Sequence, residues 1–234
     1  MLTSIEAEAQ FTITGLKGMV SVPHAEVLDD RTFMIGMHTN DFSYFLNRDS
    51  NRPLNENEKV YSLNIAFLKK LNVILNLTRV NNSGDTLGIG DRDAQITYLI
   101  FEEKDRLPSI VVNFGVPDTD GEQFLAGNHL VMSKCLAITS ELSVKNSLGY
   151  GVPFVFGGFS RDGFLQEKKS EFLTGLFGGL ELIYLEKSRL SLEYDGRAIN
   201  AGLTHVFFKK ISLELFLQGV SQFGFGVNYM GGIN

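Results

Sequence analysis

Carboxylates that fall on the polar side of alternating polar and apolar stretches are the residues of this chain best suited to chemistry. They share one predicted face with the cation Lys145, and they are Asp93, Glu141, Glu181, Glu193, Asp195 and Glu214. Charges inside a protein are tolerated only when they are hydrated or paired. The set therefore predicts one of two interiors: a polar acidic lining that prefers cations or hydrogen-bonds sugars, or a salt-bridged filling.

The four histidines point to neither a metal site nor a catalytic site. His24, His38, His129 and His205 lie in different segments without the spacing of metal ligands. Only His129 is expected on the face of the carboxylates, and no local signature joins a serine, a histidine and an orienting residue. We therefore predict no metal, no cofactor and no enzymatic activity. A lipid-modifying enzyme that uses His129 is the lesser alternative.

Binding signals elsewhere in the chain are few. Gly88-Ile89-Gly90-Asp91-Arg92 has the glycines of a phosphate loop but lacks the helix that would aim amides at a phosphate. Arg79 ends an apolar face, where it is either a lipid-phosphate ligand or a plain rim arginine. Cys135 is the single cysteine, which excludes a disulfide framework. A net charge of −6 without a basic stripe excludes a nucleic-acid partner.

A two-residue hydrophobic period positions these side chains on strands. The predicted strands cover about 32–40, 58–68, 71–80, 92–102, 107–116, 123–134, 136–146, 172–185, 189–195, 198–208, 211–218 and 221–230. Several of them follow short turns that contain lysine, such as Lys69-Lys70, Lys134-Cys135 and Lys209-Lys210. The apolar residues after these turns are predicted to face lipid: Leu75, Leu77, Ile138, Leu142, Leu213, Leu215 and Leu217.

Short and long connections alternate, which is how outer-membrane barrels arrange periplasmic turns and extracellular loops. The last two outer loops, around Asp195-Arg197 and Gly219-Val220, are short and depart from this asymmetry. The longest connection, 147–171, is rich in glycine and phenylalanine. It is expected either to fold into the barrel mouth as a constriction that gates the lumen or to pack against a partner protein. A soluble sandwich would show the same alternation with inside and outside exchanged. Twelve strands around a dry apolar core would, however, leave a cavity too wide to fill.

The predicted fold is therefore all-β: a closed antiparallel up-and-down transmembrane β-barrel of about 12 strands over residues 31–234. Residues 1–30 are predicted to form a periplasmic segment or a plug. Ala7-Glu8-Ala9 resembles a cleavage site, so residues 1–10 are read as a signal-peptide remnant. An even strand number leaves both termini periplasmic.

Several stretches resemble the YjbH-type family of exopolysaccharide-associated outer-membrane barrels. They are Gly15 to Ala25 with Thr32 to Gly36, Asp93 to Glu102, Pro108 to Gly115, Phe124 to Lys134, Phe177 to Glu181 and Leu192 to Gly196. Val116 to Asp120 departs from the glycine-rich turn expected there. The resemblance implies a Gram-negative outer-membrane protein that assists exopolysaccharide production or export.

Two roles stay open for such a barrel. One is a passage with a polar lumen, and the other is a closed accessory or structural subunit of a larger outer-membrane complex. The partners implied are outer-membrane lipid, polysaccharide, and other outer-membrane or periplasmic proteins.

Overall fold

A computed structural model describes residues 9–41, 57–80, 88–117, 125–156, 165–168 and 170–233. The wall strands are β1 (Thr32–Asp41), β2 (Asn57–Leu68), β3 (Leu71–Val80), β4 (Gly88–Phe101), β5 (Ser109–Pro117), β6 (Asn128–Ala137), β7 (Leu142–Val152), β10 (Gly175–Tyr184), β11 (Ser188–Tyr194), β12 (Ile199–Phe207), β13 (Ile211–Gln218) and β14 (Gln222–Gly232). Two short strands, β8 (Phe154–Phe156) and β9 (Leu165–Glu167), pair only with each other.

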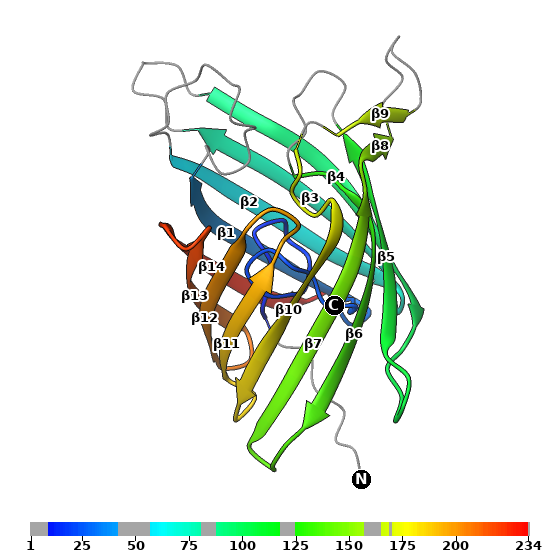
Figure 1. The fold of residues 1–234 in the computed structure, drawn as a ribbon, viewed down its shortest axis with the longest axis vertical. Coiled ribbons are helices and arrows are strands. Elements are labelled where there is room, and N and C mark those ends of the chain that lie inside the picture. Colours follow the sequence, from blue (N-terminus) through cyan, green and yellow to red (C-terminus); the bar gives the residue numbers. More distant parts are fainter. Residues whose placement is uncertain are drawn as a thin grey trace.

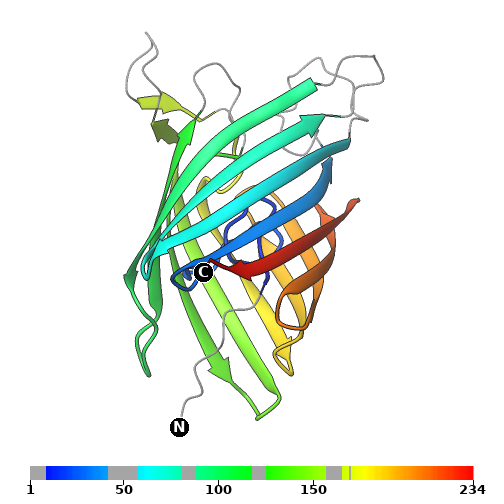
Figure 2. The same ribbon diagram turned by 180° about the vertical axis from the view of Figure 1, so that it is seen from behind.

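These twelve wall strands close into one antiparallel barrel (Figures 1 and 2). Each wall strand pairs with its neighbours in the chain, and β1 closes the ring against β14 with Thr32 opposite Gly232. No helix long and apolar enough to cross a membrane occurs among the described residues. The predicted closed up-and-down barrel of about 12 strands is confirmed.

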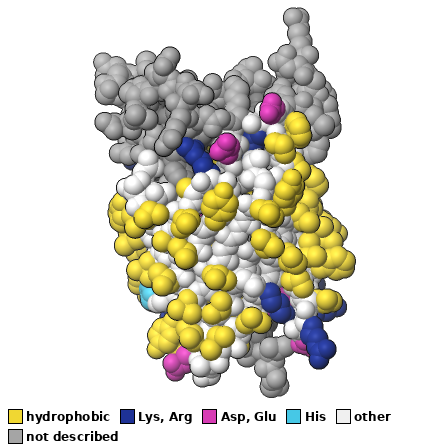
Figure 3. Space-filling model, viewed as in Figure 1, with side chains coloured by type: hydrophobic (Ala, Val, Ile, Leu, Met, Phe, Trp, Pro, Cys, Tyr) yellow, Lys and Arg dark blue, Asp and Glu magenta, His cyan; other side chains and the backbone are white. Residues whose placement is uncertain are grey.

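The direction of the alternation is also clear from the structure. On β13, Leu213, Leu215 and Leu217 are exposed, whereas Ser212, Glu214, Phe216 and Gln218 are buried. The same pattern recurs on the other strands, so that polar side chains point inward and apolar ones outward. Figure 3 shows hydrophobic side chains covering the middle of the barrel wall, with charged side chains nearer its two ends. This is the polarity of a transmembrane barrel rather than of a soluble one.

One predicted turn is wrong. Cys135 lies within β6, and the chain reverses beyond it, at Ile138–Glu141. The hydroxyl of Thr139 accepts hydrogen bonds from the amides of Glu141 and Leu142 and so stabilises the turn there. Lys134 is a strand residue whose ammonium pairs with Glu103 at 3.0 Å. The lysine that was read as a turn marker is therefore a partner of the neighbouring connection.

The stretch 147–171, which was predicted to be one long connection, contains strand residues. Residues 147–152 continue β7, and β8 and β9 form a small hairpin beyond the wall. Residues 157–164 and 169, which the gating prediction includes, lie outside the described part. Phe172 and Leu173 are buried in the apolar cluster inside the barrel.

Aromatic rings on the inner wall lie over glycines of the neighbouring strand. Phe177 on β10 is directly opposite Gly149 on β7, and Phe216 on β13 is directly opposite Gly224 on β14. A Cβ atom built at either glycine would come within 2.2 Å of the facing ring. Glycine at these positions leaves room for the rings to cover the strand.

Gly149→Ala should destabilise the barrel by about 1–3 kcal/mol, the usual cost of adding a carbon to a packed site. Urea unfolding in detergent, followed by far-UV circular dichroism, measures the loss. Gly232→Ala is the control, because a Cβ atom at Gly232 meets nothing within 4 Å. Equal stability of the two variants would contradict the packing of Phe177 on Gly149.

Candidate functional site in the barrel lumen

Residues 9–31, which we call the luminal segment, lie inside the barrel as far as Leu28 (Figures 1 and 2, dark blue), and Asp29 to Arg31 are exposed where the chain enters β1. Phe11, Ile13, Met19 and Val20 are fully buried there. The segment folds back on itself, with the amide of Thr12 donating to the carbonyl of Leu16 and the amide of Ile13 to that of Val20. The sequence predicted a periplasmic segment or a plug for residues 1–30, of which residues 1–8 lie outside the described part.

Glu193 on β11 binds the backbone of the luminal segment. Its two carboxylate oxygens accept the amide of Ser21 at 2.8 Å and the amide of Val22 at 2.9 Å. Asn200 on β12 donates to the same carboxylate at 3.0 Å. Buried amides need an acceptor, and a carboxylate is a strong one. A side chain predicted to line a lumen thus holds the chain that occupies it.

Glu181 on β10 is the second wall carboxylate bound to the luminal segment. It accepts a hydrogen bond from the side-chain amide of Gln10 at 2.7 Å and pairs with the ring of His24 at 3.1 Å. Arg189 on β11 donates to the same carboxylate at 3.2 Å. Glu181 is 0% exposed, so these partners replace the water that its charge would otherwise need.

In the ion pair of Lys145 on β7, the wall residue carries the positive charge and the residue of the luminal segment carries the negative charge. Its ammonium binds the carboxylate of Glu26, which Lys17 also pairs with at 2.8 Å. Burial would raise the pKa of the Glu26 carboxyl, but the charges of Lys145 and Lys17 outweigh it and hold that pKa well below its usual range. Glu26 therefore carries its charge at neutral pH.

Neutral side chains anchor the segment to other parts of the wall. Asn64 on β2 donates to the carbonyl of Gly15 at 2.9 Å, and Asn76 on β3 donates to that of Thr14 at 3.0 Å. On β6, the hydroxyl of Ser133 accepts the amide of Ala25 at 2.7 Å. Together with the charged contacts, these bonds distribute the anchors around the barrel.

Two wall glycines provide space for the segment. A Cβ atom at Gly202 on β12 would lie 2.5 Å from the side chain of Val20, and one at Gly179 on β10 would lie 2.8 Å from Met19. Any larger residue at these inward positions would push against the segment. The wall thus fits its occupant in shape as well as in charge.

A second polar cluster lies around Asp93, His129 and Lys168. The ammonium of Lys168 donates to the carbonyl of Phe172, and Gln95 donates to Asp93 at 2.9 Å. Burial lowers the pKa of Lys168 to about 7, although the nearby carboxylates of Asp93 and Asp195 act in the opposite direction. His129 packs edge-on against Phe177, with ring centroids 5.7 Å apart.

The other predicted inward residues have structural partners. Glu214 pairs with His38 at 3.2 Å. Asp195 accepts the amides of Arg197 and Ala198, at 3.0 and 2.9 Å, and so closes the turn between β11 and β12. The prediction that His129 is the one inward histidine is wrong, because His24 and His38 are buried inside as well.

Glu141 is not a luminal residue. It is exposed in the turn at Ile138–Glu141, because β6 extends further than the sequence suggested. For the same reason Ile138 lies in that turn rather than on a strand face. Leu142, the first residue of β7, is only partly exposed. Arg79 is exposed near the end of β3 that leads to a long connection.

Sequence reasoning missed the residues of the luminal segment that bind the wall, above all Gln10, His24 and Glu26. The signal was available in part: Glu26 and Lys17 are charges in an otherwise apolar stretch. Arg189 was missed too, although it alternates with the apolar residues of β11 and therefore faces inward.

A family model described as "YjbH: Exopolysaccharide biosynthesis protein YbjH" matches residues 12–232. The chain belongs to the YjbH family. The match includes the luminal segment almost entirely, together with the whole wall, and it confirms the resemblance found in the sequence. No curated protein matches this YjbH-family chain.

Among solved structures, the YjbH-family chain is similar to other barrels at low identity. The KdgM porin is 11% identical, with a TM-score of 0.48 over 86% of this chain and 99% of that one. An outer membrane channel from Pseudomonas putida F1 is 13% identical, with a TM-score of 0.42 over 88% and 96%. Outer membrane phospholipase A from Escherichia coli is 12% identical, with a TM-score of 0.39 over 86% and 91%.

The prediction of no enzymatic activity, which rests on the lack of a local catalytic signature, is contradicted by the comparisons. Two of the similar barrels are outer membrane phospholipases, from Escherichia coli and Salmonella typhi. A fold does not by itself exclude an activity.

Glu193→Ala should loosen the luminal segment without unfolding the wall. The amides of Ser21 and Val22 lose a charged acceptor, and each such bond contributes about 1.5–3 kcal/mol. Their hydrogen exchange should accelerate about tenfold or more, since about 1.4 kcal/mol corresponds to a factor of ten. Glu186→Ala, in an exposed turn, should leave exchange unchanged. Unaltered protection of Ser21 and Val22 in Glu193→Ala would refute the anchoring role.

Proposed function

We propose that this YjbH-family protein is a closed outer-membrane barrel that assists exopolysaccharide production or export, with its own luminal segment as the closure. The observation that carries the proposal is the binding of that segment by wall residues of opposite or complementary polarity: Glu193, Glu181 and Lys145. Since their charges are satisfied within the chain, the barrel is stable while closed. The family supplies the link to exopolysaccharide.

The outer membrane is the location that best suits the exterior of the barrel. Exposed leucines, phenylalanines and tyrosines cover the wall strands. Exposure of this apolar surface to water would be unfavourable in free energy, whereas contact with lipid is not. We assign the short turns and both termini to the periplasm, because periplasmic turns are short in barrels of this kind. Arg79, near the opposite end of the wall, would then bind lipid phosphate.

The second candidate function is that of a passage, which would open when the luminal segment is displaced from the lumen. The inner wall is lined by side chains such as Asn64, Asn76, Glu181 and Glu193, which would hydrate once the segment is displaced. An acidic, polar lumen of this kind would suit hydrated cations or the hydroxyl groups of a sugar chain. A partner protein in the outer membrane or periplasm would supply the displacement.

Conductance in planar bilayers separates the closed barrel from the passage. The full chain should show no current, whereas Glu181→Ala/Glu193→Ala and a deletion of residues 1–28 should show current steps. Glu141→Ala/Glu186→Ala is the matched control, because it removes two carboxylates from exposed turns. Current through the full chain equal to that of the deletion would contradict closure by the segment. Absence of current through the deletion would rule out the passage.

The membrane location has a separate test. The detergent-extracted protein should run faster on gels when unheated than when boiled, because a closed barrel resists unfolding by dodecyl sulfate. It should also fractionate with outer membranes. Recovery of the folded protein in detergent-free buffer would argue against the proposed location.

A further inference from the structure

The wall is least continuous between β5 and β6. Their ladder contains five residue pairs, from Ser109 opposite Ser133 to Asn113 opposite His129. Each of the other ladders of the described wall contains seven or more pairs. β5 continues to Pro117, but β6 begins at Asn128, so the upper part of β5 has no partner in β6.

Two asparagine side chains connect the strands where this ladder ends. Asn128 accepts the amide of Gly115 on β5 at 3.0 Å and donates to the carbonyl of Phe154 on β8 at 2.9 Å. Asn113 donates to the carbonyl of Gly127 at 2.9 Å and accepts from the hydroxyl of Thr97 at 2.8 Å. Side-chain hydrogen bonds thus take over from backbone pairing where the β5–β6 ladder ends.

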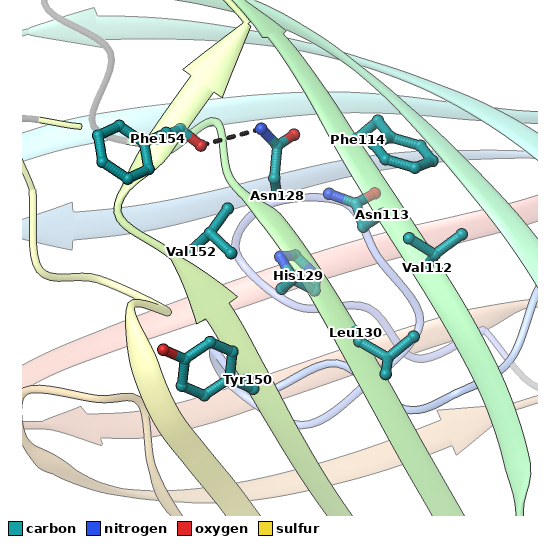
Figure 4. Close-up of a pocket in the computed structure, with 9 residues that line it drawn as sticks. All are labelled: Val112, Asn113, Phe114, Asn128, His129, Leu130, Tyr150, Val152 and Phe154. Atoms are coloured by element: carbon teal, nitrogen blue, oxygen red, sulfur yellow. Dashed lines mark hydrogen bonds between the residues drawn. The ribbon is translucent and has the colours of Figure 1, made fainter. Parts of the chain in front are cut away.

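A pocket of about 420 Å³ lies over this junction (Figure 4). Its volume falls within the range of roughly 300–1,000 Å³ that is usual for small-molecule sites. The pocket is lined by Val112, Asn113, Phe114, Asn128, His129, Leu130, Tyr150, Val152 and Phe154. Of these, Leu130 and Tyr150 are about half exposed on the outer face of the wall, and Phe154 on β8 is exposed to a similar degree.

The chemistry of the lining favours an aliphatic ligand. No charged Lys, Arg, Asp or Glu side chain belongs to the described lining. Asn113 and Asn128 use their amide groups in the hydrogen bonds that join the strands, and the ring of His129 packs against Phe177 on the inner side of the wall. The surface offered to a ligand is therefore made of Val, Leu, Phe and Tyr side chains.

We propose that this pocket binds one acyl chain of a lipid of the surrounding membrane. The inference rests on the proposed membrane location, because the pocket is continuous with the apolar outer face of β5, β6 and β7. On the regular wall, lipid chains meet a convex surface and exchange freely. At the β5–β6 junction a chain would lie in an open hollow between side chains of β5, β6 and β7 and would contact each of these strands.

The absence of tryptophan from the sequence gives a direct test. Tyr150→Trp places one fluorophore in the pocket, and Leu215→Trp places one on the regular wall at similar exposure, 54% and 49% for the original side chains. Each full-length variant is placed in nanodiscs that contain increasing fractions of phosphatidylcholine with a brominated acyl chain. Two bromine positions along the chain correct for depth in the bilayer.

Tyr150→Trp should be quenched steeply and to saturation, with half-maximal quenching at a several-fold lower brominated fraction than Leu215→Trp, whose quenching should follow the bulk fraction. Adding Val112→Phe, which narrows the pocket, should remove the difference. Equal curves for the two reporters would overturn the acyl-chain site alone. Quenching of Leu215→Trp without quenching of Tyr150→Trp would show another occupant, such as a second copy of the chain, and would also overturn it. No quenching of either would overturn both the site and the membrane location.

Discussion

Charges on the inner wall need partners, and this requirement ties the barrel to its luminal segment. Glu181 and Glu193 are almost fully buried, and their ligands come largely from residues 9–31. The segment has the converse need, because the amides of Ser21 and Val22 are buried without a helix or sheet to pair with. Wall and segment each satisfy polar groups that the other cannot satisfy alone. A free-energy cost therefore accompanies any state in which they separate.

The wall was predictable because its information is local. A two-residue period assigns Glu181, Glu193 and Glu214 to one face of the sheet and Leu213 and Leu215 to the other. The polar face is then expected inside, because apolar side chains could not fill the interior of a closed barrel of twelve strands. The turn after β6 was misplaced because a lysine was taken as its marker. The hydroxyl of Thr139 was the more direct signal, since it bonds to two amides of the turn.

The luminal segment was not predictable in the same way, because it has no period. Gln10 meets Glu181 across 171 positions of the chain, and Val22 meets Glu193 across the same distance. Nothing in the local sequence specifies such a pair. The wall glycines Gly179 and Gly202 acquire a meaning only when Met19 and Val20 are seen beside them. The activity of a protein is likewise not specified by its fold alone.

The wall residues that bind the luminal segment are distributed around the barrel, and this affects how the barrel could open. Asn64, Asn76, Ser133, Lys145, Glu181 and Glu193 hold the segment from six different strands. A change at one strand releases one anchor and leaves the others in place. Partial withdrawal is also unfavourable, because it breaks buried polar contacts before water can replace them. The segment is therefore expected to behave as a bistable element, and a signal that opens the barrel has to pull on the segment rather than deform the wall.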